Sequence, residues 1–385
     1  MTTNNRLLSL DILRGITIAG MILVNNPGSW NFVYAPLGHA EWNGLTPTDL
    51  IFPFFMFIMG VSMYISLKKL NFSHTNDTLY KILKRSIIIF IIGLGIAWFS
   101  LFCRTYQQTD NLPFIDRFLN SLLNFDKIRI LGVLQRLALS YCFASLLVIF
   151  IRHKYIPYIV GSTLIVYFLI LYFGDGFDKS ENNIVSVIDR AILGVNHMYK
   201  DAGLAIDPEG ILSTIPSVCQ VLIGFYCGKI MLNSKDNYSR IVNLFIVGTL
   251  LTFTGFLLSY GCPINKKIWS PTFVLVSCGM ASSFLALLIW IIDIHGYHKW
   301  TFYFKSFGVN PLFIFVMAGI LSTILRVISF SSDSESINLH GFIYSDILQP
   351  IFGNYPGSLI FAISFMTLCW LIGYILYRRK IFIKV

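Results

Sequence analysis

Charged residues are scarce in this chain. Only 12% of its 385 residues are Asp, Glu, Lys or Arg, which is about half of the roughly 25% that a soluble domain carries. Hydrophobic residues make up 55% of the sequence. A soluble protein of this length needs far more charge than this to cover its surface. The composition therefore excludes an ordinary soluble fold and predicts a protein embedded in a lipid bilayer.

Two further sequence signatures are missing. No Cys-x-x-Cys pair occurs, so neither a disulfide framework nor a metal site is expected, and most of the seven cysteines are interpreted as small apolar residues. The first apolar stretch contains Asp11 and Arg14 and has no small-x-small cleavage site. We therefore expect this stretch to remain as the first helix and not to be removed as a signal peptide.

Long apolar runs predict the fold class. A spanning helix needs roughly 20 apolar residues. Such runs lie at about 7–26, 47–67, 83–102, 130–150, 156–173, 211–232, 241–259, 271–293, 306–328 and 357–378. We therefore expect an all-α integral membrane protein with about ten transmembrane helices in one bundle, forming a single domain over residues 1–385. No internal repeat is evident.

The distribution of basic residues predicts the orientation. The formal net charge is +10, yet there is no basic stripe or arginine-rich tail, so nucleic acid is not an expected partner. Lys and Arg gather in the short segments on the side of the N-terminus, and the much longer opposite segments hold fewer. By the positive-inside rule, both termini should lie in the cytoplasm. The longer loops, about 103–129, 174–210 and 329–356, should then face outward.

Two ionisable residues interrupt the first span. Asp11 and Arg14 are three residues apart, so a helix places them on one face. Charges within a span are costly and are candidates for function. One interpretation is a local ion pair that lets both residues enter the bilayer. The other is that Arg14 faces an anionic ligand while Asp11 orients it, and the sequence leaves both open.

The segment between the first two spans carries the densest group of polar residues, namely His39, Glu41, Trp42, Asn43 and Asp49. A histidine in a loop at a membrane mouth is usually just solvated, although it has the chemistry of a general base. The sequence Thr-Pro-Thr-Asp at 46–49 also suits a helix start, with proline in the first turn and an acidic side chain near the positive end of the dipole. Helix capping alone would explain Asp49.

Polar clusters also precede three later spans. Residues 129–136 include Arg129, Gln135 and Arg136. Gln135 beside Arg136 suggests a hydrated cavity. The alternative explanation is that the long side chain of Arg136 snorkels to the membrane surface. Residues 207–210 read Asp-Pro-Glu-Gly, and residues 265–270 read Asn-Lys-Lys-Ile-Trp-Ser. Helix capping would explain Ser213, which follows the second cluster, and Ser270, which ends the third, about as well as binding of a ligand would.

Together these segments resemble the transmembrane acetyltransferase family typified by heparan-α-glucosaminide N-acetyltransferase, in its bacterial form. Residues 6–11 with Arg14 and Gly15 are similar to the opening motif of the family. Residues 39–46, 49–53 and 57–60 are similar to its long signature, and the clusters at 129–136, 207–210 and 265–270 follow in the family's order. The resemblance covers nearly the whole chain.

The resemblance implies transfer of an acetyl group from cytosolic acetyl-CoA to the amine of a glucosamine-type sugar on the extracytoplasmic side. The family's catalytic histidine and its nearby asparagine correspond to His39 and Asn25. Expected acceptor-binding residues are Trp42, Asn43, Asp49, Asp11 and Glu209, and expected acetyl-CoA-binding residues are Arg14, Arg129, Gln135, Arg136 and Lys266. The expected partners are an amino-sugar or glycan acceptor and the lipid bilayer of the inner membrane, with a homodimer left open.

The residue chemistry agrees with this expectation. Imidazole titrates near neutral pH and can take a proton from an ammonium. Asn25 can donate to a tetrahedral oxyanion, and guanidinium groups bind phosphates. No glycine-rich phosphate loop is present, so coenzyme A would lie among the helices. An acetyl-His39 intermediate is equally compatible, and the alternative functions are an O-acyltransferase of surface polysaccharide and a polytopic transporter, which the missing repeat disfavours.

Overall fold

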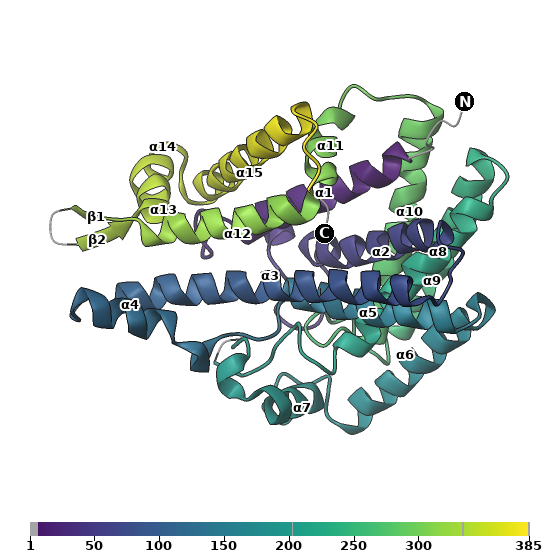
Figure 1. Ribbon diagram of the computed structural model, residues 1–385, viewed down its shortest axis with the longest axis horizontal. Coiled ribbons are helices and arrows are strands. Elements are labelled where there is room, and N and C mark those ends of the chain that lie inside the picture. The colour runs from purple at the N-terminus through teal and green to yellow at the C-terminus, as the bar shows by residue number, and fades with distance from the viewer. Residues whose placement is uncertain (1–6, 202, 333–334, 384–385) are drawn as a thin grey trace.

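The computed structural model describes residues 7–201, 203–332 and 335–383, so Arg6 of the opening motif lies outside the described residues. The chain folds almost entirely into helices (Figure 1). The helices are α1 (Leu8–Asn25), α2 (Pro47–Lys68), α3 (Asn76–Gln108), α4 (Phe114–Leu122), α5 (Val133–Phe150), α6 (Ile156–Phe173), α7 (Ile184–Leu193), α8 (Thr214–Asn233), α9 (Asn237–Leu258), α10 (Pro271–Leu288), α11 (Thr301–Val309), α12 (Pro311–Val327), α13 (Leu339–Gly341), α14 (Gln349–Phe352) and α15 (Asn354–Arg378). Two short antiparallel strands, β1 (Ser329–Ser332) and β2 (Glu335–Asn338), are the exception to the expected all-α fold.

The long helices make this a multi-pass membrane protein. Among the described residues, nine helices are long and apolar enough to cross a membrane, and a bent pair raises the number to ten if it forms one span. The nine are α1, α2, α3, α5, α6, α8, α9, α10 and α15. This confirms the helical fold and the expected number of spans. The side on which the termini lie stays a prediction.

One expected span is broken. The apolar run at 306–328 was predicted as a single helix, but α11 and α12 meet at Asn310 with an angle of 84°. Pro311 lacks the backbone N–H needed to continue α11 and disfavours a helical conformation at the residue before it. The amide side chain of Asn310 then bonds the backbone of the C-terminal tail, donating to Ile381 O and accepting from Ile383 N, each at 2.8 Å.

Close packing of α2 against α8 fixes the centre of the bundle. A Cβ added at Gly60 would lie 2.1 Å from the carbonyl oxygen of Val221, and a Cβ added at Gly224 would lie 2.1 Å from that of Phe57. Because only glycine permits this approach, the two backbones touch in the way common for membrane helices. The loop before α2 is thereby held beside the loop before α8.

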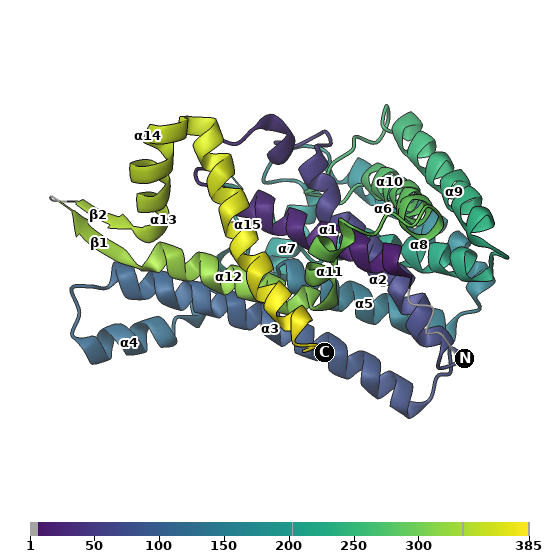
Figure 2. The same cartoon turned by 90° about the horizontal axis from the view of Figure 1, so that it is seen from above.

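The long loops gather on one side of the molecule. Trp42 Nε1 donates to Phe177 O at 2.6 Å, Ile130 N donates to His197 O at 3.2 Å, and a His340 ring nitrogen lies 3.2 Å from Pro27 O. These contacts join the loops that follow α1, α4, α6 and α7, and link the first of them to α13, which lies beyond α12. We call this the His39 side, and the opposite side, where α2 ends, the Lys68 side. Figures 1 and 2 show α4 and the β1–β2 hairpin at the same end of the molecule.

Candidate active site

His39 and Asp49 form a hydrogen-bonded pair at the start of α2. The two atoms His39 Nδ1 and Asp49 Oδ1 are 2.7 Å apart. The imidazole is 40% exposed and the carboxylate 1%. A carboxylate that accepts from Nδ1–H fixes the ring tautomer and leaves the lone pair on Nε2. The arrangement therefore presents Nε2 of His39 as a base or nucleophile at an accessible surface.

The local fold explains why Asp49 is held so firmly. Thr46 caps α2, accepting from Asp49 N at 3.4 Å, and its own N–H donates to Asp49 Oδ2 at 3.2 Å. Pro47 occupies the first turn, and Ala40 N donates to Asp49 Oδ2 at 3.1 Å. The capping interpretation of Asp49 is thus correct. The other carboxylate oxygen, Oδ1, contacts His39. One side chain thus both caps α2 and orients the imidazole.

Lys266 completes this group, which we call the His39 cluster (His39, Asp49 and Lys266). Its Nζ lies 3.2 Å from His39 Nδ1 and 3.4 Å from Asp49 Oδ1. Burial lowers the pKa of Lys266, while the negative charges of Asp49 and Glu209 oppose that change. The sequence placed Lys266 with acetyl-CoA, and the structure places it against the catalytic candidate.

Two residues expected to bind the acceptor connect neighbouring loops. Asn43 Oδ1 accepts from Asn265 Nδ2 at 3.1 Å, and Gly44 N donates to Ile264 O at 2.8 Å. Trp42 donates to the backbone of Phe177. These bonds fix the segment that carries Lys266 and the segment that carries His39 relative to each other.

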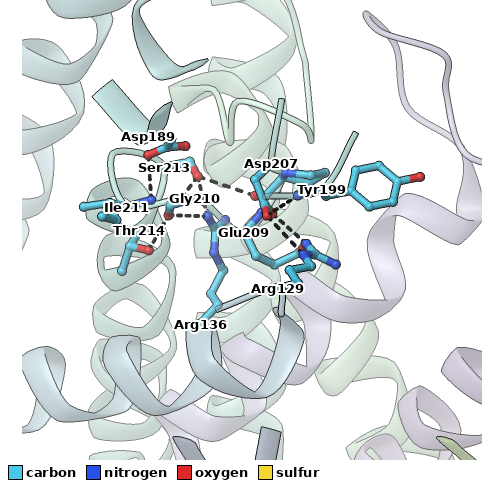
Figure 3. A network of polar contacts seen from close by, with 11 residues as sticks. Arg129, Arg136, Asp189, Tyr199, Asp207, Glu209, Gly210, Ile211, Ser213 and Thr214 are labelled. Carbon is cyan, nitrogen blue, oxygen red and sulfur yellow. Dashed lines mark hydrogen bonds and ion pairs between the residues drawn. The ribbon is translucent and has the colours of Figure 1, made fainter. Parts of the chain in front are cut away.

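Arg129 is neutralised by two carboxylates (Figure 3). Its guanidinium donates to Asp207 at 2.6 and 3.0 Å and to Glu209 at 2.5 Å. Asp207 also accepts from Tyr199 N at 2.9 Å. Burial works to lower the pKa of Arg129, but Glu209 and Asp207 outweigh it and raise that pKa above its usual value. An arginine engaged in this way has little capacity left for a phosphate.

Arg136 is fully buried beneath the same loop. Its Nη2 donates to Gly210 O at 3.0 Å and to Ser213 Oγ, and its guanidinium lies 4.8 Å from the ring centroid of Trp269. Figure 3 shows Arg136 approaching the loop from α5, while Asp189 lies near the opposite side of that loop. The position is that of a residue which holds the loop before α8.

Asp189 is a buried group that the sequence reasoning missed. Its Oδ1 accepts from Ile211 N at 2.8 Å and from Leu212 N at 3.2 Å. Burial raises the pKa of Asp189 to about 6. A Cβ at Gly210 would lie 1.7 Å from Asp189 Oδ2, so the glycine of the Asp-Pro-Glu-Gly segment is required by this contact. The amphipathic pattern of residues 184–193 was the available signal.

A cavity of about 370 Å³ lies among five helices. Its walls come from α1, α2, α3, α5 and α12, with Ile383 of the tail beside them. Along α2 it runs from Phe52 to Met63, about 16 Å at 1.5 Å per residue. Phe52 is about one helical turn from Asp49, so one end of the cavity approaches the His39 cluster. The volume lies in the usual range for small-molecule sites.

The other end of the cavity carries two arginines. Arg14 projects from α1 and donates to Ser62 Oγ at 2.7 Å and to Asp11 Oδ1 at 3.2 Å. Arg85 projects from α3 and lies 4.8 Å from the ring centroid of Tyr141. The cavity lining includes Arg14, Ser62, Arg85 and Tyr141. Arg14 thus forms the local ion pair with Asp11 and also lines a cavity, while an anionic ligand for Arg14 stays a prediction.

The remaining expected site residues lie apart from the cavity lining. Asn25 is the last residue of α1 and is exposed, whereas its neighbour Asn26 is buried and donates to Ile22 O at 2.8 Å. Gln135 is buried against α3, where a Cβ at Gly93 would lie 2.5 Å from its Oε1. Within the described residues, the cavity lining includes Arg14 of the five expected acetyl-CoA residues and omits Arg129, Gln135, Arg136 and Lys266.

Comparisons with known proteins point to one family. Residues 6–256 match the family described as heparan-alpha-glucosaminide N-acetyltransferase, catalytic. The chain is similar to heparan-alpha-glucosaminide N-acetyltransferase of Mus musculus, 28% identical over 440 residues that cover 99% of this chain and 61% of the relative. It is 29% identical to that of Homo sapiens over 445 residues, covering 99% and 60%. The chain thus spans about three fifths of the length of these curated relatives.

Proposed function

This chain belongs to the heparan-α-glucosaminide N-acetyltransferase catalytic family, and on that basis we propose that it transfers an acetyl group from acetyl-CoA to the amine of a glucosamine-type sugar. The observation that carries the proposal is the cavity along α2, whose lining includes two arginines at one end and, at the other, Phe52, about one helical turn from Asp49. A site of this form can hold a long donor at one end and an acceptor at the other.

We assign the cavity to the donor. Coenzyme A carries its phosphates at one end and its thioester at the end of a flexible arm. Arg14 and Arg85 supply cationic donors for the phosphates, and Phe55, Met59 and Phe315 supply apolar walls for the arm. The thioester would then reach Phe52, about one turn from Asp49. Arg129 and Arg136 were expected to bind the donor as well, but their contacts support a role in holding the loop before α8.

The reaction follows from the free Nε2 of His39. This atom takes a proton from the acceptor ammonium, and the amine lone pair then attacks the thioester carbonyl carbon. The C–N bond forms, and the C–S bond breaks as the tetrahedral oxyanion collapses. The adduct nitrogen passes its second proton to the leaving thiolate, and His39 releases its own proton to water. Asn25, at the end of α1, is our proposed donor to the oxyanion.

A covalent route uses the same atoms. His39 Nε2 would attack the thioester first, and the amine would then attack the acetyl-imidazole. Asp49 supports either route, because it holds Nδ1 and stabilises the positive charge that develops on the ring. Both routes therefore require the His39–Asp49 pair.

We propose that the Lys68 side faces the cytoplasm of a plasma membrane and the His39 side faces outward. The basic residues Lys68, Lys69, Arg378 and Arg379 lie at the C-terminal ends of α2 and α15, and we assign both ends to the cytoplasmic side by the positive-inside rule. Both arginines of the cavity then face the compartment that contains acetyl-CoA.

A transfer assay tests the proposed function. Purified protein in detergent receives labelled acetyl-CoA with either glucosamine or glucose, which has a hydroxyl in place of the amine. We expect labelled N-acetylglucosamine and no product from glucose. Acetylation of glucose at a similar rate would instead identify an O-acyltransferase, and absence of transfer to every amino sugar would contradict the proposal.

Arg14→Ala tests the donor assignment. Loss of charge-assisted hydrogen bonds worth about 1.5–3 kcal/mol should weaken acetyl-CoA binding by roughly ten- to a hundredfold. Isothermal titration of the folded variant measures this affinity. The matched control is Arg117→Ala, which removes an arginine on α4 that contacts Tyr106 away from the cavity. Unchanged donor affinity in Arg14→Ala would leave only the ion pair with Asp11 as the role of Arg14.

A further inference from the structure

We propose that Lys266 is a positioning residue whose ammonium group offsets the charge of Asp49 and so keeps His39 in its neutral form, while Asp49 itself accepts from Nδ1–H and fixes the tautomer. This inference rests on the proposed function, in which neutral His39 is the base or nucleophile. It assigns to Lys266 a role at the imidazole in place of the phosphate contact that its position in the sequence suggested.

The geometry separates Lys266 from the reacting atoms. Its Nζ contacts the same ring nitrogen, Nδ1, that Asp49 contacts, at 3.2 Å. The Nε2 atom lies on the opposite edge of the ring. Lys266 therefore acts on the protonation state of the ring and does not reach an acceptor or an oxyanion at Nε2. Nor does it line the cavity assigned to the donor, among the residues that the structure describes.

Hydrogen bonds hold the segment that carries Lys266 in place. Asn265 bonds Asn43 through its side chain and accepts from Lys267 N at 2.8 Å. The next lysine, Lys267, turns away and pairs with Asp201 at 2.6 Å. Two adjacent lysines thus have different partners, and only the first contacts the His39–Asp49 pair.

The balance of charge around His39 explains the effect. Asp49 is buried, and an uncompensated carboxylate at 2.7 Å would strongly favour the imidazolium form. Lys266, 3.4 Å from the same oxygen, offsets that negative charge. The other charges facing this group are already paired, since Glu209 is bound to Arg129 and Lys267 to Asp201. Glu41, on the same loop as His39, is exposed.

The proposal requires Lys266 to be charged, and its ion pair with Asp49 Oδ1 at 3.4 Å supports this. Burial, with a smaller contribution from Lys267, lowers the pKa of Lys266 on balance, although Asp49 and Glu209 act to raise it. With the ammonium in place, protonation of His39 would put two cations against one carboxylate. Without it, an imidazolium–carboxylate pair is the favoured state. Removal of the charge should therefore move the acid limb of the pH–rate profile toward higher pH.

The test compares Lys266→Met and Lys266→Gln with the charge-conserving Lys266→Arg and with the matched control Lys267→Met. Diethyl pyrocarbonate reacts with neutral imidazole, and mass spectrometry reports its modification of His39 between about pH 5 and pH 9. We expect the midpoint of modification to rise by about one pH unit in the two neutral variants. Lys266→Arg and Lys267→Met should match the wild type.

The outcomes separate this inference from the proposed function. Because the modification needs neither donor nor acceptor, an inactive wild type would overturn the acetyltransferase proposal and still leave Lys266 open to measurement. An unshifted midpoint in both neutral variants overturns the role of Lys266. A loss of acetyl-CoA affinity with an unshifted midpoint would instead support the phosphate contact, while an upward shift with unchanged donor affinity supports the positioning role.

Discussion

His39→Ala is expected to reduce turnover by roughly a hundredfold or more, the usual effect of removing a general acid–base group. The reason is that Asp49 holds Nδ1 of the partly exposed imidazole, which leaves Nε2 as the ring nitrogen for the reaction. Affinity for acetyl-CoA should change little, because the imidazole acts at the reacting carbon and the phosphates are assigned to Arg14 and Arg85. Initial rates at saturating donor, together with donor titration, measure both quantities.

The control for this variant is His74→Ala, which removes an exposed histidine on the Lys68 side. It should keep the turnover and the donor affinity of the wild type. Near-normal acetyl transfer by folded His39→Ala protein would mean that the histidine is a bystander. The catalytic assignment would then be wrong, although the membrane architecture would be unaffected.

Asp49→Asn should also lose roughly a hundredfold or more in turnover. Asparagine has nearly the shape of aspartate, but it carries no charge to stabilise the developing imidazolium and can present its NH₂ to Nδ1, which selects the wrong tautomer. The cap of α2 should survive, because the side-chain oxygen can still accept from Thr46 N and Ala40 N. Steady-state kinetics and thermal unfolding distinguish a catalytic loss from a folding defect.

A double variant sharpens the result for Asp49. If Asp49 acts through His39, then Asp49→Asn should add little to the loss already caused by His39→Ala, because residues that act as a unit are strongly non-additive. Losses that multiply in the double variant would show that Asp49 acts elsewhere. In that case capping of α2 would be its main role.

Local sequence patterns predicted much of the fold. Apolar runs located α1, α2 and α6 to within a few residues, because a bilayer demands long uninterrupted apolar helices. The run at 306–328 misled the prediction, since hydropathy does not register the break at Asn310 and Pro311. An Asn-Pro pair inside an apolar run was the signal that deserved more weight.

The site was harder to derive, because its contacts join distant segments. Lys266 and His39 are separated by 227 positions, and no local pattern links them. Asp49 looked sufficiently explained by capping, and its second contact required the folded loop. Arg85 was not among the residues expected at the site, although it lines the cavity. Its position on the cavity depends on how α3 packs against α5, which hydropathy does not specify.

The most direct test of the central claim is sidedness in sealed proteoliposomes. Labelled acetyl-CoA is placed outside, and glucosamine is placed either inside or outside. Because the arginines line the end of the cavity away from the His39 cluster, we expect labelled N-acetylglucosamine only when donor and acceptor are on opposite sides of the membrane, with detergent restoring activity to the same-side sample. Equal product with both substrates outside intact vesicles would contradict transfer across the membrane.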